Sequence, residues 1–90
     1  MAKNKHETIK DLTLMLLYLT SWKDKELQDL REDVRTAWKG YDFDVLNELT
    51  DENLINGSGR GNKTAYLFKE GIEKAEDLLR KYGIEIEETK

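Results

Sequence analysis

The sequence predicts one small α+β domain in which helices surround a short β-hairpin. Ninety residues are enough for a single modest core and too few for two. An acidic amphipathic segment is followed by three glycines within seven residues, and then by a β-branched and aromatic run. Two strands joined by a flexible tip have this pattern. We therefore expect a single domain over residues 1–90, with residues 1–6 and 84–90 as loose tails.

The first predicted helix covers residues 7–21, with Thr8 as its N-cap. Apolar residues recur three, four and three positions apart, which predicts one face packed on the core: Ile9, Leu12, Leu16 and Leu19. Leu14, Leu17 and Tyr18 lie around the rest of the helix, so it needs burial on more than one side. The helix either runs through the middle of the domain or takes part in self-association. For the second case we expect a homodimer formed through these three residues.

Residues 22–39 carry a weaker helical pattern, from which we expect a short second helix. A tight aromatic turn follows, in which Gly40 can supply a positive φ. The third helix begins at Asp42 or Asp44, because a carboxylate caps free backbone amides and meets the positive end of the helix dipole. It ends near Asn53, since asparagine tolerates the left-handed conformation after a helix.

The next segment reads as a hairpin before the last helix. Leu54-Ile55 begins a strand, residues 56–62 form the glycine-rich tip, and residues 64–68 form the return strand. The last helix covers residues 69–82, and Gly83 serves as its C-cap. A helix-turn-helix, a two-stranded β-wing and a C-terminal helix together outline a winged helix.

The chain resembles winged-helix proteins in a few runs, namely Asp44-Val45-Leu46-Asn47-Glu48-Leu49, Glu52-Asn53-Leu54-Ile55, the glycine-rich tip, Tyr66-Leu67 and Glu70-Gly71. More closely, it resembles an uncharacterised family of short bacterial proteins defined by a domain of unknown function. This resemblance covers roughly residues 11–82, and its most specific part is Ala37-Trp38-Lys39-Gly40-Tyr41-Asp42-Phe43-Asp44-Val45-Leu46-Asn47. It implies the winged-helix shape and brings no established activity. The chain departs from the family pattern at Asn53, where glycine is usual, and at Phe68, where threonine would cap the final helix.

Charge is segregated along the chain. Residues 42–55 carry five acids and no base, whereas residues 56–69 carry only the bases Arg60, Lys63 and Lys69. We expect Arg60 and Lys63 on the wing to contact the phosphates of double-stranded DNA, with Arg35 and Lys39 extending this basic surface and Asn47 suited to adenine.

The acidic third helix opposes phosphate binding. The alternative function is therefore a protein-interaction or dimerisation module, which would use the acidic third helix and the apolar first helix and would not bind DNA. Trp38, Tyr41 and Phe43 could form a platform for a base or a ligand. Aromatic residues around a tight turn are more often core anchors, and we interpret these three as anchors.

Composition argues against several other classes. No cysteine is present, so neither a disulfide nor a thiolate metal site is available. The one histidine, His6, lies in a segment expected to fray, and Asn62 stands where a phosphate-binding loop needs glycine. The longest apolar run has six residues, and the first residues lack a signal-peptide core. We expect a cytoplasmic protein that is not an enzyme, with no catalytic residue, cofactor, metal or membrane contact.

Overall fold

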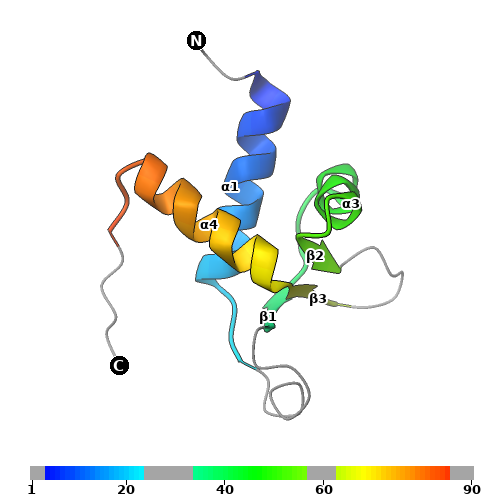
Figure 1. Cartoon of the computed structure of the whole chain (residues 1–90). Coiled ribbons are helices and arrows are strands. Elements are labelled where there is room, and N and C mark those ends of the chain that lie inside the picture. The colour runs from blue at the N-terminus through cyan, green and yellow to red at the C-terminus, as the bar shows by residue number, and fades with distance from the viewer. Residues whose placement is uncertain (1–3, 24–33, 57–62, 86–90) are drawn as a thin grey trace.

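The computed structural model describes residues 4–23, 34–56 and 63–85, and these residues form an α+β domain (Figure 1). The described helices are α1 (Lys5–Leu19), α3 (Phe43–Asp51) and α4 (Lys69–Lys81). The described strands are β1 (Arg35–Trp38), β2 (Ile55–Asn56) and β3 (Thr64–Leu67). They form an antiparallel sheet in the order β1-β3-β2, and α1 packs against α4, α3 and β1.

Helix α1 begins earlier than the sequence predicts. Asn4 is its N-cap, and the side-chain oxygen of Asn4 accepts a hydrogen bond from the backbone N–H of Glu7 at 2.8 Å. Residues 4–6 therefore belong to a capped helix start, and the prediction of a loose tail was wrong for them. Residues 1–3 lie outside the described residues.

The face of α1 that packs on the core is the opposite of the predicted one. Leu14 and Leu17 are 1% and 0% exposed and belong to the hydrophobic core, and Tyr18 packs against that core. The residues predicted to face the core are instead exposed: Ile9, Leu12, Leu16 and Leu19. The helix carries apolar residues nearly all round, so its periodicity fits both orientations. A dimer through Leu14 and Leu17, as the sequence suggested, would require opening the core.

The second predicted helix is wrong where the structure describes it. Residues 35–38 form strand β1, which pairs with β3 so that Arg35 faces Leu67 and Trp38 faces Thr64. Thr36 and Ala37 of β1 are both buried. Because successive side chains of a strand point to opposite faces, Ala37 faces the core on the same side of the sheet as Leu67, and Thr36 lies on the other face. The rest of that predicted helix, residues 24–33, lies outside the described residues. Helix α3 is thus preceded by a strand and a turn.

The remaining elements follow the prediction closely. The Asp42 carboxylate caps α3 by accepting a hydrogen bond from the N–H of Val45 at 3.2 Å, and Asn53 has the left-handed φ of 62°. Strands β2 and β3 pair as the wing predicts, although the tip, residues 57–62, lies outside the described residues. Gly83 follows α4 with a left-handed φ of 69°, the conformation that commonly ends a helix.

Helix α4 approaches the backbone of Leu54, the residue before β2, closely at Gly71. A Cβ on Gly71 would stand 2.1 Å from the backbone oxygen of Leu54, so only glycine fits there. Buried side chains of the three described helices and of the strands meet in one core, including Leu17 of α1, Leu46 and Leu49 of α3, Ile55 of β2, Leu67 of β3 and Leu79 of α4. Among the described residues, α3, α4 and β1 pack against one side of α1, and the apolar residues on its other side are exposed (Figure 1).

Candidate functional surfaces

A row of large apolar side chains runs along the solvent side of α1. We call this row the outer stripe, and it consists of Ile9, Leu12, Leu16 and Leu19, which are 39–48% exposed. The 3–4–3 spacing places the four on one face of the helix. Contiguous apolar surface of this kind marks a contact site more often than scattered exposed residues do.

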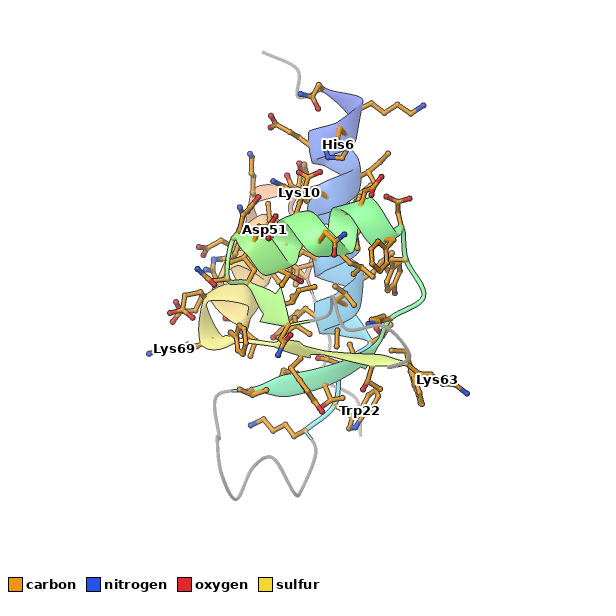
Figure 2. All side chains as sticks on the ribbon, turned by 90° about the vertical axis from the view of Figure 1, so that its right-hand side faces the viewer. His6, Lys10, Trp22, Asp51, Lys63 and Lys69 are labelled. Carbon is orange, nitrogen blue, oxygen red and sulfur yellow. The ribbon has the colours of Figure 1, made fainter. Side chains whose placement is uncertain are left out.

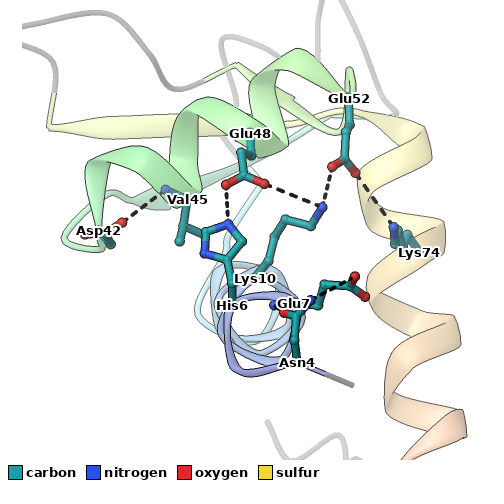
Figure 3. A network of polar contacts seen from close by, with 9 residues as sticks. All are labelled: Asn4, His6, Glu7, Lys10, Asp42, Val45, Glu48, Glu52 and Lys74. Atoms are coloured by element: carbon teal, nitrogen blue, oxygen red, sulfur yellow. Dashed lines mark hydrogen bonds and ion pairs between the residues drawn. The ribbon is translucent and has the colours of Figure 1, made fainter. Parts of the chain in front are cut away.

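Polar contacts on the other side of α1 brace it against α3 and α4 (Figure 3). Lys10 Nζ lies 2.5 Å from a Glu52 carboxylate oxygen and 3.9 Å from one of Glu48. His6 Nε2 contacts Glu48, and Lys74 Nζ of α4 lies 3.8 Å from Glu52. We call Lys10, Glu48, Glu52 and Lys74 the ion-pair cluster. His6, predicted to fray, is part of α1 and contacts this cluster through Glu48. Two of the five acids assigned to an interaction face are directed at cations of the same chain.

Lys10 is the cation at the centre of the ion-pair cluster, and only 17% of its side chain is exposed. Its hydrogen bond with Glu52 raises its pKa above 10.5, and the charges of Glu52, Glu48 and Glu7 act in the same direction. Partial burial works against this shift by disfavouring the charged form. The cluster therefore stabilises the charged lysine and fixes the orientation of α1.

Arg35 is held inside the fold by its own neighbours. Its Nε donates to Ser21 Oγ at 2.5 Å, one terminal nitrogen donates to the Ser21 carbonyl at 2.9 Å, and the guanidinium lies 5.8 Å from the Tyr18 ring centroid. The Tyr18 hydroxyl in turn donates to Glu76 at 2.9 Å. A groove of about 480 Å³ opens beside these residues, with cations and acids in its wall: Tyr18, Lys23, Arg35, Lys69, Ile72, Glu73 and Glu76. Its mixed charge selects no single ligand class.

The sheet ends in a corner that combines aromatic and basic residues, which we call the aromatic corner: Trp22, Trp38, Lys39 and Lys63. The two indole rings lie 5.4 Å apart and tilted by 48°, and Trp38 is 60% exposed. The backbone N–H of Lys39 donates to the Lys63 carbonyl at 2.9 Å, which brings the two lysines to one end of the β1–β3 pair. Figure 2 shows Trp22 and Lys63 on the same side of the molecule, with Lys63 pointing outward.

The prediction of core anchors fails for two of the three aromatic residues. Trp38 and Phe43 are 60% and 47% exposed, whereas Tyr41 is half-buried and packs on the core. Tyr41 thus packs toward the core, whereas Trp38 and Phe43 are exposed to solvent. The structure therefore leaves two large rings free for contact near the start of α3.

Of the described residues predicted to contact DNA, Lys39 and Lys63 lie at one end of the β1–β3 pair, and Arg35 and Asn47 lie elsewhere. Lys39 and Lys63 come together, Arg35 is engaged with Ser21, and Asn47 is half-buried on α3. Arg60 lies outside the described residues. Asp44 and Asp51 are exposed on α3 and keep its outer side negative.

Among residues 4–23, 34–56 and 63–85, no cluster of three or more histidine or acidic side chains is placed to hold a metal ion. None of the helices in this part of the chain has the length and apolar character needed to cross a bilayer.

A family model described as a domain of unknown function, DUF6429, matches residues 5–85. The chain belongs to this family. It is also similar to an uncharacterized protein, y4hR, of Sinorhizobium fredii (strain NBRC 101917 / NGR234), with 31% identity over 75 residues that cover 83% of this chain and 88% of the relative. The predicted resemblance to an uncharacterised bacterial family is thereby confirmed. No solved structure matches the chain.

Proposed function

We propose that this DUF6429 protein is a non-catalytic protein-interaction module that docks a partner helix on the outer stripe of α1. The exposed stripe carries the proposal, because four large apolar side chains remain open to solvent on a helix whose other side is fully packed. Helices recognise one another through such rows, in which side chains three and four positions apart fill the gaps of the facing helix.

The support beneath the outer stripe favours docking on a preformed surface. The ion-pair cluster joins α1 to α3 and α4, and the core fixes Leu14 and Leu17 under the same helix. A surface held in this way loses little conformational freedom when a partner binds, which increases affinity.

The size of the outer stripe makes the interaction weak. Burying a whole leucine or isoleucine side chain stabilises by about 1.5–3 kcal/mol. Since 39–48% of each residue is still exposed, docking gains about 1 kcal/mol per side chain, or about 4 kcal/mol for the stripe. Such a gain only begins to offset an association cost of about 4–15 kcal/mol, so the partner must contribute a comparable surface.

Site-specific photo-cross-linking in the producing cells tests this function. A photoreactive residue at position 12 should give covalent protein adducts, and the same residue at the exposed position of Lys81 on α4 is the matched control. Adding Leu16→Glu to the first variant should remove the adducts while thermal unfolding shows an intact fold. Equal adduct yields at positions 12 and 81 would contradict the proposal.

A second candidate is DNA association by a winged-helix arrangement. Two observations support it: the strand order β1-β3-β2 with α3 before the wing, and the pairing of Lys39 with Lys63 beside exposed Trp38. The negative outer side of α3 opposes it, so the wing and the aromatic corner would have to supply the affinity.

Titration with random duplex DNA at low and moderate salt separates the two functions. If the wing binds phosphates, Arg60→Ala with Lys63→Ala should weaken binding and lower the salt slope by about 2, whereas Lys81→Ala should leave both unchanged. Absence of affinity at low salt would remove the DNA candidate and leave the protein-interaction module unaffected.

A further inference from the structure

We propose that the partner helix is α1 of a second copy of this chain, packed antiparallel on the outer stripe. This inference rests on the proposed function, because it names the occupant of the same surface. The observation behind it is the symmetry of the stripe itself.

The outer stripe has the same spacing in both directions along the helix. Its residues lie at positions 9, 12, 16 and 19, so reversing the helix about position 14 exchanges Ile9 with Leu19 and Leu12 with Leu16. A two-fold axis there would bring each large apolar residue opposite another one. A two-fold contact requires such a self-complementary surface.

Charge does not oppose this arrangement. The neighbouring positions along the stripe carry threonine or lie in the core, and the charged residues within its length, Lys10 and Asp11, are on the packed side of α1. Within residues 9–19, two stripes can therefore meet without placing like charges opposite each other; beyond this length, Lys5 of one copy lies toward Lys23 of the other. Along α1 the one basic residue on this face is Lys5, one turn before Ile9, whereas an anionic lipid surface favours several basic residues along the rim.

The geometry of α1 also allows a second copy to approach. The N-terminal turns of α1 project beyond α3 and α4 (Figure 1). The stripe continues from these turns to Leu19 at the end of the helix. The four residues span ten positions, which corresponds to about 15 Å of helix, and this short length predicts a reversible dimer rather than a permanent one.

Thiol cross-linking gives the sharpest test of the orientation, because the natural chain contains no cysteine. An equimolar mixture of Leu12→Cys and Leu16→Cys proteins, treated with a short thiol-specific cross-linker, should form a mixed dimer in higher yield than either variant alone. Parallel packing would reverse this preference, since each variant would then face itself. Such a reversal, or equal yields from all three samples, would overturn the antiparallel arrangement.

Sedimentation equilibrium tests the association without cysteine. The natural chain should show a concentration-dependent dimer up to about 1 mM, and Leu12→Glu should weaken it about 100-fold because two carboxylates enter the contact. Ile84→Glu changes an exposed apolar residue outside α1 and should have no effect. A monomer at 1 mM, with adducts at position 12 in cells that consist only of other proteins, would overturn the second-copy inference and leave the interaction module standing.

Discussion

At the scale of single residues, Thr36 of β1 carries a buried side-chain hydroxyl that lacks a hydrogen bond within the described residues. A buried hydroxyl in this state costs free energy that an apolar group of the same shape does not. Thr36 lies on the face of β1 opposite the core residue Ala37, and its β-branch suits a strand position.

Thr36→Val should therefore stabilise the protein. The valine keeps the shape and the β-branched preference for a strand while removing the unpaired hydroxyl, so the free energy of unfolding should rise by about 1 kcal/mol. Urea unfolding of both proteins measures the difference. A lower free energy of unfolding for Thr36→Val would contradict the prediction that the hydroxyl is unpaired in the folded protein.

Deprotonation of Lys10 makes the free energy of unfolding depend on pH in the alkaline range. Its folded-state pKa is raised above 10.5, so its contribution to stability is complete below pH 10.5 and is lost as the pH rises through the folded-state pKa. Lys10→Met should flatten the fall of stability in that alkaline range, with a loss of about 1 kcal/mol at neutral pH. Lys81→Met, which lies outside the ion-pair cluster, provides the control. If both variants keep the natural slope above pH 10.5, Lys10 does not couple to folding in this way.

At the scale of elements, Gly71 controls how closely α4 approaches the chain before β2. Gly71→Ala should destabilise the protein by about 2 kcal/mol or more, because the new methyl group would meet the Leu54 carbonyl, which is backbone and cannot move alone. Thermal unfolding checks this expectation. Gly40→Ala is the matched control, since a Cβ at Gly40 would meet no atom within 4 Å. A small effect of both substitutions would mean that α4 can shift away from Leu54 at little cost.

Features of the helices and strands that depend on neighbouring residues were predicted from the sequence, whereas those that depend on distant contacts were not. Local chemistry predicted the α3 cap at Asp42, the left-handed Asn53 and the strands on both sides of the glycine-rich tip, because each depends on neighbouring residues. Strand β1 was missed because its pairing with β3 joins segments far apart in sequence. The buried face of α1 was predicted wrongly for a similar reason, because the face that is buried depends on where α3, α4 and β1 pack.

The candidate surfaces were predicted less well than the fold. Lys39 and Lys63 do meet, but Arg35 is drawn inward by Ser21, a contact between residues on different elements. The outer stripe was visible as a 3–4–3 repeat, and the same repeat describes a core-facing helix. Asp11 and Lys10 lie on the side of α1 that packs, and charged residues at those positions favoured the opposite orientation.

At the scale of the whole molecule, the account predicts weak self-association. Two copies would together gain about 8 kcal/mol from their outer stripes. An association cost of about 4 kcal/mol, the low end of the range, leaves about 4 kcal/mol, which corresponds to a dissociation constant of about 1 mM. The dimer would be populated only where the local concentration is high or where a further contact adds to it. The aromatic corner, with Trp38 60% exposed, is available for such a contact.

Methyl NMR spectra recorded over a range of protein concentrations test the central claim most directly. If the outer stripe is the docking surface, the methyl resonances of Ile9, Leu12, Leu16 and Leu19 should shift progressively as the concentration rises toward about 1 mM. The resonances of core residues such as Leu46 and Leu49 should stay fixed. Stripe resonances that do not change over this range, or shifts confined to residues outside α1, would contradict the account.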